Sequence, residues 1–139
     1  MATGDQNPDI ERIEADDGLL ALIMRGDSDP GRTRFFTSED ATCQVGFVVH
    51  PQGYEIPRHV HEPVPREVNS TWEVLVVRRG QCDVDIYDGG NQCVATRRLS
   101  EGDIIVLIGC GHGFRMLEDT VLLKVKQGPY LGADDKQPF

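Results

Sequence analysis

The sequence predicts an all-β fold, and three observations lead to this prediction. Apolar and polar residues alternate with a period of two over most of the chain beyond residue 42. These runs recur about every ten residues and are separated by turn-forming glycine, proline and aspartate residues. No strong helical periodicity competes with them, and the apolar run Leu19–Met24 alone is ambiguous. Short strands at such intervals are typical of a β-sandwich or β-barrel.

The first half of the chain predicts two neighbouring strands. Residues 43–50 alternate between two faces, Pro51–Gly53 forms a turn, and residues 54–61 form a second strand. Pro63 and Pro65 then exclude a strand in the segment that follows, because proline cannot donate to a β-ladder.

The second half predicts a longer series of strands. Residues 72–78 are rich in β-branched side chains and are followed by Gly80 and a hairpin that turns at Gly89–Gly90. Three further strands, separated by turns and a glycine cluster, are expected over residues 104–108, 114–117 and 121–126.

The chain of 139 residues is expected to form a single domain, since chains of this length usually do so. We place the barrel core at about residues 35–127. Residues 1–30 are expected to form an N-terminal extension and residues 128–139 a C-terminal tail.

The charge balance argues against two classes of partner. Lys and Arg number 14 against 23 Asp and Glu, a formal net charge of -9. Nucleic acids and anionic membranes both need a positive surface. No apolar stretch approaches the roughly 20 residues of a membrane-spanning helix. The acidic start Met1–Gly18 lacks the basic and apolar regions of a secretory signal, so we expect a soluble, cytoplasmic protein.

The four cysteines are expected to be reduced, because they form no CxxC pair and no zinc-ribbon spacing. A two-residue turn at Gly89–Gly90 would pair Cys82 with Arg97, too far along the ladder for a bridge to Cys93. Cys110 has two interpretations, a buried apolar thiol or a thiol that lines a site near His112.

Two of the four histidines form the sequence His59-Val60-His61. Residues two apart in a strand point to the same face, so both imidazoles are expected to project together, as metal ligands often do. Taken in isolation, such a pair is more often two exposed histidines on a polar strand edge, and the surrounding residues favour the metal interpretation here.

Glu73 is an acid in an apolar strand, on the face that carries Leu75 and Val77. A buried carboxylate is costly unless it is protonated, paired or bound to a metal. His112 follows soon after the apolar strand 104–108. Three histidines and one acid are thus placed so that all four could belong to a single site.

At these positions the chain resembles the cupin superfamily. The first cupin motif reads G-x5-H-x-H followed by E-x6-G, and its positions are occupied by Gly53, His59, His61, Glu73 and Gly80. The second motif begins with Gly-Asp and ends with a histidine in a glycine-rich turn, matched by Gly102–Asp103 and Gly109–His112. The resemblance covers roughly residues 43–127.

The chain departs from the family pattern in two places. Eleven residues separate His61 from Glu73, more than the family usually has, so Glu62 and Glu67 are alternatives for the carboxylate. The second motif lacks the usual proline and is one residue short, which leaves the reach of His112 open.

The resemblance implies a cupin jelly-roll β-barrel whose metal ligands are His59, His61, Glu73 and His112. Such a set suits Fe(II), Mn(II), Ni(II), Zn(II) or Cu(II). It also implies a small-molecule metalloenzyme of the dioxygenase, isomerase or lyase type. The alternative is a non-catalytic module that binds or senses a sugar or an organic acid.

The strand over residues 72–77 is apolar on both faces, because Val74 and Val76 point away from Glu73 and Leu75. Another sheet or another subunit should cover this second face. The cupin resemblance implies a homodimer, and coverage by the chain's own N-terminal segment is the alternative.

Overall fold

The computed structural model describes residues 10–132 and 135–139, and within them the chain forms ten β-strands and no helix. The all-β prediction is confirmed. None of these segments forms a helix of the length and apolarity that a membrane crossing needs. Residues 1–9 of the expected N-terminal extension and residues 133–134 of the expected tail lie outside the described residues. The chain divides into two units. The residues before position 29 and after position 69 form the first unit, and residues 29–69 form the second.

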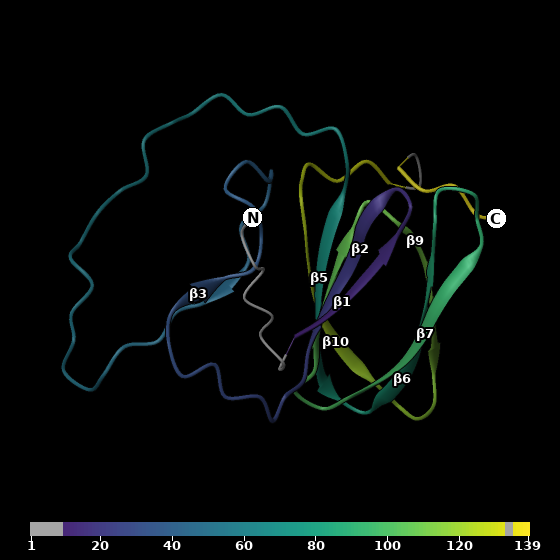
Figure 1. Cartoon of the computed structure of the whole chain (residues 1–139), viewed down its shortest axis with the longest axis horizontal. Coiled ribbons are helices and arrows are strands. Elements are labelled where there is room, and N and C mark those ends of the chain that lie inside the picture. Colours follow the sequence, from purple (N-terminus) through teal and green to yellow (C-terminus); the bar gives the residue numbers. More distant parts are fainter. Residues whose placement is uncertain (1–9, 133–134) are drawn as a thin grey trace. The chain divides into compact units, whose positions relative to one another are not determined.

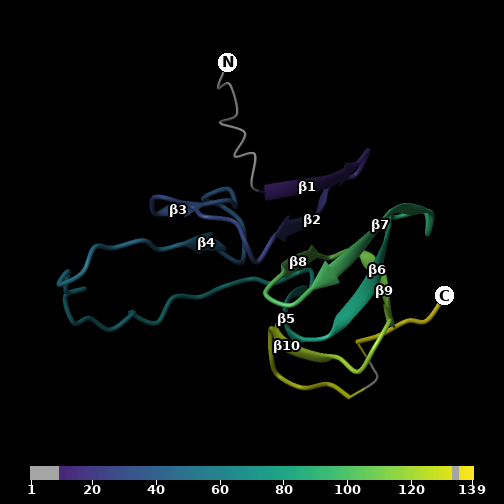
Figure 2. The ribbon, with the colours of Figure 1, turned by 90° about the horizontal axis from the view of Figure 1, so that it is seen from below.

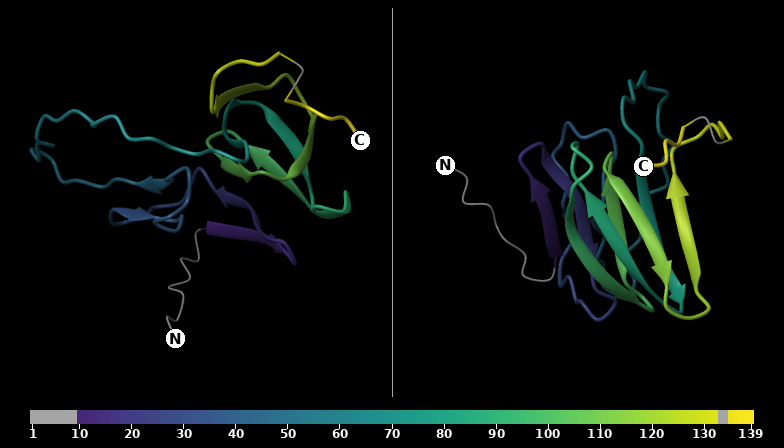
Figure 3. Two further views of the ribbon diagram at one scale, coloured as in Figure 1. Left: turned by 90° about the horizontal axis from the view of Figure 1, so that it is seen from above. Right: turned by 90° about the vertical axis from the view of Figure 1, so that its right-hand side faces the viewer.

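The first unit contains two antiparallel sheets, which do not close into a barrel within the described residues (Figure 1). The larger sheet has the order β1-β2-β8-β5-β10, formed by Ile10–Ala15, Gly18–Met24, Ile104–Ile108, Trp72–Arg79 and Val121–Lys126. The smaller sheet has the order β7-β6-β9, formed by Cys93–Ser100, Gln81–Tyr87 and Gly111–Met116. Figures 2 and 3 show β6, β7 and β9 grouped together, with the turn after β9 leading back to β10.

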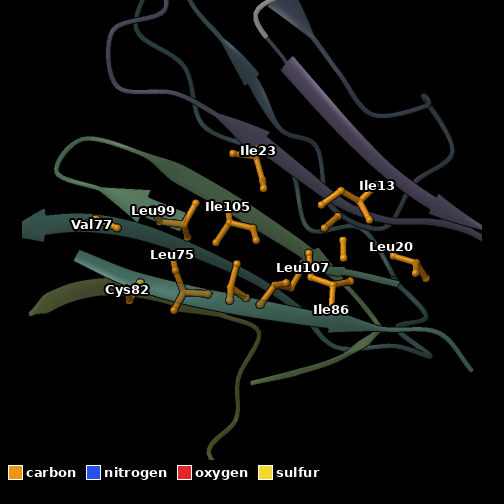
Figure 4. Close-up of a cluster of buried hydrophobic side chains, with 13 residues drawn as sticks. Ile13, Leu20, Ile23, Leu75, Val77, Cys82, Ile86, Leu99, Ile105 and Leu107 are labelled. Atoms are coloured by element: carbon orange, nitrogen blue, oxygen red, sulfur yellow. The ribbon is translucent and has the colours of Figure 1, made fainter. Parts of the chain in front are cut away.

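The hydrophobic core of the first unit lies between the inner faces of these two sheets (Figure 4). Alternate residues of each strand point inward, because side chains along a strand alternate between its faces. The core side chains come from both sheets and include Leu75, Val77, Ile105 and Leu107 of the larger and Cys82, Val84, Ile86 and Leu99 of the smaller. Glu73 shares the inner face with Leu75 and Val77, since it pairs directly with Leu107.

Residues 10–24 form β1 and β2 and complete one side of the larger sheet, although the sequence assigns them to an extension outside the barrel core. The ambiguous run Leu19–Met24 is part of β2. Successive residues Leu22 and Ile23 point to opposite faces, and both are buried. A strand covered on both faces is continuously apolar, which is why its sequence shows no alternation.

The hairpin between β6 and β7 turns over a five-residue loop, Asp88–Gln92, so the predicted two-residue turn is wrong. Asp88 N–H donates to the Gln92 carbonyl at 2.9 Å, and Asn91 takes the left-handed conformation at φ 60°. The longer loop shifts the register, and Cys82 pairs with Leu99 instead of Arg97. All four cysteines are nevertheless free thiols, as expected.

The second unit holds one short antiparallel pair, β3 over Arg34–Phe35 and β4 over Gly46–Phe47. The strand predicted over residues 43–50 is reduced to β4, and the strand predicted over residues 54–61 does not form. The Thr33 hydroxyl donates to the Val49 carbonyl and accepts from the Val49 N–H, at 3.1 and 2.8 Å. A side chain therefore takes the place of a partner strand just beyond β4.

The turn between β7 and β8 is held by the carboxylate of Asp103, which is buried. It accepts hydrogen bonds from the backbone N–H groups of Gly26 and Ser100, both at 2.8 Å, and from the Arg25 guanidinium at 3.0 Å. Gly102 precedes it at φ 89°, a conformation that favours glycine. The Gly-Asp pair of the second motif thus fixes the start of β8.

Asp83 lies on the outer face of the smaller sheet between two arginines. Its Oδ1 accepts from Nε of Arg98 at 3.0 Å, and its Oδ2 accepts from Arg98 and Arg115, both at 3.2 Å. The hydrogen bond from Arg98 is the main cause that holds the pKa of Asp83 below its ordinary value. These contacts tie β6 to both of its neighbours.

Replacing the core residue Leu99 by alanine is expected to lower the free energy of unfolding by about 2–5 kcal/mol, because it leaves a cavity between the sheets. Leu99 is 1% exposed, whereas Leu123 on the outer face of β10 is 52% exposed. Leu123→Ala is the matched control and should stay within about 0.5 kcal/mol of the wild type. Urea denaturation followed by circular dichroism measures both, and equal losses would contradict the assigned inner face.

Asp83→Asn is expected to destabilise the protein at neutral pH and to do so less as the pH falls. The lowered pKa of folded Asp83 adds stability that is complete above the unfolded pKa of about 3.9. This stability is lost as the pH falls through the lower, folded pKa. Melting temperatures measured from pH 7 to pH 3 should converge for the two proteins, and a difference independent of pH would refute this role.

Candidate metal centre

Glu73 is the second residue of β5 and is buried, with 6% of its surface exposed. Its neighbours on the same inner face are Leu107 of β8 on one side and Lys126 of β10 on the other. Side chains two residues apart on β5 share a face, so Glu73 lies on the inner face together with the core residues Leu75 and Val77. A charged group here needs partners from other strands.

His112 reaches Glu73 from the opposite sheet. It is the second residue of β9 and pairs with the core residue Ile86, which places its side chain on the inner face. Its Nε2 lies 3.2 Å from Oε2 of Glu73. The Phe114 ring lies beside the imidazole, with 6.0 Å between the ring centroids. The two sheets thus bring together an acid and a histidine that are 39 positions apart in the sequence.

The contact between His112 and Glu73 meets the distance of an ion pair but not the geometry of a hydrogen bond. Oε2 of Glu73 is buried and accepts no hydrogen bond from any described residue. Nδ1 of His112 lies 3.1 Å from the Cys110 carbonyl, to which it can donate. A neutral imidazole with its proton on Nδ1 carries a lone pair on Nε2. Two electron-pair donors, Nε2 and Oε2, then lie close together, as they do around a bound cation.

Glycines shape the segment that presents His112. Gly109 takes the left-handed conformation at φ 60° and donates its N–H to the Thr71 carbonyl at 3.2 Å. Gly111 lies on the outer face of β9, where a Cβ would come within 2.8 Å of the Phe139 ring. The glycine-rich turn therefore allows a tight connection from β8 and close packing behind the histidine.

Lys124 of β10 contacts the other oxygen of Glu73. It points inward opposite Leu75, and its Nζ lies 3.2 Å from Oε1. Lys124 is not among the site residues predicted from the sequence, although the alternation of β10 carries a signal for it. Leu122, Lys124 and Lys126 share one face, and Leu122 packs against the core. A lysine between core-facing positions indicates an acid within its reach.

His59 and His61 lie in the second unit. Nδ1 of His59 is 2.8 Å from the Pro57 carbonyl, which leaves Nε2 free to act as a ligand in the same way as in His112. The two imidazoles lie edge to face with their centroids 5.1 Å apart, and both side chains are exposed. Glu62 and Glu67, the alternative acids, are exposed in the same unit.

The structure therefore groups the four candidate ligands two by two, Glu73 with His112 in the first unit and His59 with His61 in the second. Within the described residues, no three His, Cys, Asp or Glu side chains are gathered closely enough to hold a metal ion. Comparisons with protein-family models, with curated proteins and with solved structures found no match to this chain.

Cys110 behaves as a structural thiol. It is half-buried and packs against the hydrophobic core. Burial raises the pKa of the Cys110 thiol, and the negative charge of Glu73 contributes in the same direction. Because the thiolate is the reactive form, this environment disfavours both nucleophilic attack and metal ligation by Cys110. The burial of Cys82 raises the pKa of that thiol as well.

Thiol labelling of the folded protein at pH 7 is expected to modify Cys93, which is exposed, much faster than Cys110 or Cys82. The rates can be measured with Ellman's reagent on the wild type and on Cys93→Ser and Cys110→Ser. Cys93→Ser should lose a fast phase that Cys110→Ser keeps. Loss of a fast phase in Cys110→Ser would show a reactive thiol beside His112.

Proposed function

We propose that this chain binds a divalent transition metal ion through His59, His61, Glu73 and His112. The observation that carries the proposal is Oε2 of Glu73, a buried carboxylate oxygen that accepts no hydrogen bond within the described residues and lies 3.2 Å from Nε2 of His112. With the proton of His112 on Nδ1, this buried oxygen faces a lone pair and is costly to leave unsatisfied unless a cation joins the two atoms. A metal ion would remove this cost.

The donor chemistry fits such an ion. Three imidazole nitrogens and one carboxylate oxygen suit Fe(II), Mn(II), Ni(II), Zn(II) or Cu(II). His59 and His112 each have Nδ1 beside a backbone carbonyl two residues earlier. This is the outer hydrogen bond that commonly fixes the tautomer and ring orientation of a ligating histidine.

Residues 54–61 have the alternation of a strand but no strand partner, and they expose Ile56 and Val60 at 59% and 82%. β9, which carries His112, is an edge strand whose outer backbone groups can pair with another strand. Segments with strand-like alternation and open sheet edges are both sites where a further strand can pair.

We further propose a small-molecule metalloenzyme of the dioxygenase, isomerase or lyase type, with a non-catalytic sugar- or acid-binding module as the alternative. A bound divalent metal supplies Lewis-acid or redox chemistry at such a site. The chain's own residues hold and orient it. Glu73 contributes negative charge, the two Nδ1 contacts direct the imidazoles, and the Phe114 ring packs beside His112.

A homodimer belongs to the same proposal. Leu123 and Val125 of β10 are 52% and 58% exposed on the outer face of the larger sheet, and Val74 and Val76 are their direct partners on β5. An apolar stripe across two neighbouring strands favours packing against a second copy of the chain.

Untagged protein is expected to contain close to one equivalent of transition metal per chain, or to acquire it on titration. The metal should be lost in the double variant His59→Ala/His61→Ala, because two of four ligands are removed. His50→Ala is the matched control, since His50 stacks on Tyr54 in the same unit and belongs to no proposed ligand set. Elemental analysis measures the metal, and circular dichroism checks the fold.

Metal binding should also raise the stability of the wild type, by about 2.7 kcal/mol at a free metal concentration of 100 times the Kd. Thermal unfolding with and without the metal measures this shift in the wild type and in both histidine variants. Unchanged metal content and an unchanged shift in the double variant would remove His59 and His61 from the site.

A further inference from the structure

A long part of the chain between β4 and β5 has no secondary structure and no backbone partner (Figure 1). Within the described part of the chain, residues 55–69 make no hydrogen bond between backbone groups. All their side chains are exposed, and Ile56, Val60 and Val64 are 59%, 82% and 56% exposed. Exposed aliphatic side chains on a backbone with free donors and acceptors are the features of a segment that pairs with another strand.

The prolines of residues 54–66, which we call the proline segment, all have odd numbers. They are Pro57, Pro63 and Pro65. In an extended strand, the backbone N–H and C=O groups of successive residues point to alternate edges, so all the missing donors lie along one edge. Proline occurs in edge strands where its missing N–H faces solvent, and it also keeps the residue before it extended. The proline segment can therefore form an edge strand that pairs through its even-numbered residues.

The even-numbered residues of the proline segment are self-complementary about Val60. Arg58 and Glu62 lie two residues on either side of it. Ile56 and Val64 lie four residues on either side of it. Two copies that pair antiparallel, with Val60 opposite the partner's Val60, therefore set each arginine opposite a glutamate and each isoleucine opposite a valine. Opposite charges and aliphatic pairs at directly facing positions both stabilise a strand pair.

Charge favours this register over its neighbours. A two-fold axis at Arg58 or at Glu62 would set like charges directly opposite each other, which destabilises a strand pair. An axis at His59 or His61 would set a charged side chain opposite Val60. Within the described residues, Arg58 and Glu62 have no ion pair of their own, so both charges are free to pair with a second chain.

We propose that the proline segment is a self-association site, which pairs antiparallel with the proline segment of a second copy of this chain about a two-fold axis at Val60. Both copies contribute the same residues, and the contact closes on itself as a dimer. A ladder of this length is a small interface, so the dimer is weak and depends on protein concentration. The inference does not depend on the proposed metal, and it uses a different surface from the apolar stripe on β5 and β10.

Sedimentation velocity of the full-length protein, over a range of concentrations and with EDTA present, measures this dimer. Glu62→Arg is expected to weaken dimerisation about tenfold, because at two symmetric positions it turns an attraction to Arg58 into a repulsion. The same change lowers the net negative charge of the chain, so a general effect of charge predicts tighter association instead. The exchange Arg58→Glu/Glu62→Arg restores opposite charges and should return the dissociation constant to its wild-type value.

Glu55→Arg is the matched control, because it makes the same charge reversal at another exposed residue of the same segment. Glu55 has an odd number and lies opposite the partner's Pro65 in the proposed register, so no ion pair is lost. Its dissociation constant should not rise above that of the wild type. All the substituted positions are exposed, and circular dichroism checks that each variant folds.

Disulfide cross-linking tests the register itself. Directly opposite residues of a hydrogen-bonded antiparallel pair have Cα atoms about 5.5 Å apart, which a disulfide can span. Val60→Cys, made together with Cys93→Ser to remove an exposed thiol, should oxidise to a covalent dimer. Val64→Cys in the same background should not, because the two copies of that position lie eight residues apart along the ladder, or about 26 Å.

Three results would overturn the proposal: a monomer at every concentration, an unchanged or tighter dimer in Glu62→Arg, or equal cross-linking through Val64→Cys. A dimer that Leu123→Glu abolishes and Glu62→Arg leaves intact would also overturn it, and would assign the contact to the outer face of the larger sheet. Metal content is measured separately, so failure of the dimer and failure of the metal proposal are distinguishable.

Discussion

At one end of the core the Glu73 carboxylate lies between His112 on one oxygen and Lys124 on the other. Moving a carboxylate out of water costs several kcal/mol unless other groups compensate its charge. Three strands therefore each place a polar side chain on an inner face that is otherwise apolar. The arrangement depends on register, because a shift of one residue in β5, β9 or β10 would turn that side chain to the opposite face.

The turns of the first unit keep this register. Gly80 joins β5 to β6 at φ 94°, and a Cβ there would lie 2.7 Å from Cα of Thr120, in the turn that leads into β10. Asp103 secures the start of β8, and Asp83 ties β6 to β7 and β9 through two arginines. Several motif positions that suggest chemistry in the sequence therefore also have a structural task, namely to hold the strands that carry Glu73 and His112.

The candidate site could be predicted in part. A buried acid at position 73 follows from the alternation of its strand, and a histidine after a glycine-rich turn is visible at position 112. Lysine is not a usual metal ligand, so Lys124 is not among the predicted site residues, although its inward position is encoded in the pattern of β10. The strand predicted over residues 54–61 shows the opposite error. Alternation indicates that a segment can pair, whereas a ladder also needs a partner strand.

The sequence by itself determined the all-β class, the inner and outer faces of β5 and most turns, because these features follow from neighbours within a few residues. Tertiary structure alone decided that β9 lies opposite β5, that His112 meets Glu73 at 3.2 Å, and that Lys124 rather than Lys126 contacts the acid. It also decided the five-residue loop after β6 and the place of β1 and β2 at the side of the larger sheet. Such distances depend on strand order and register, which no local spacing specifies.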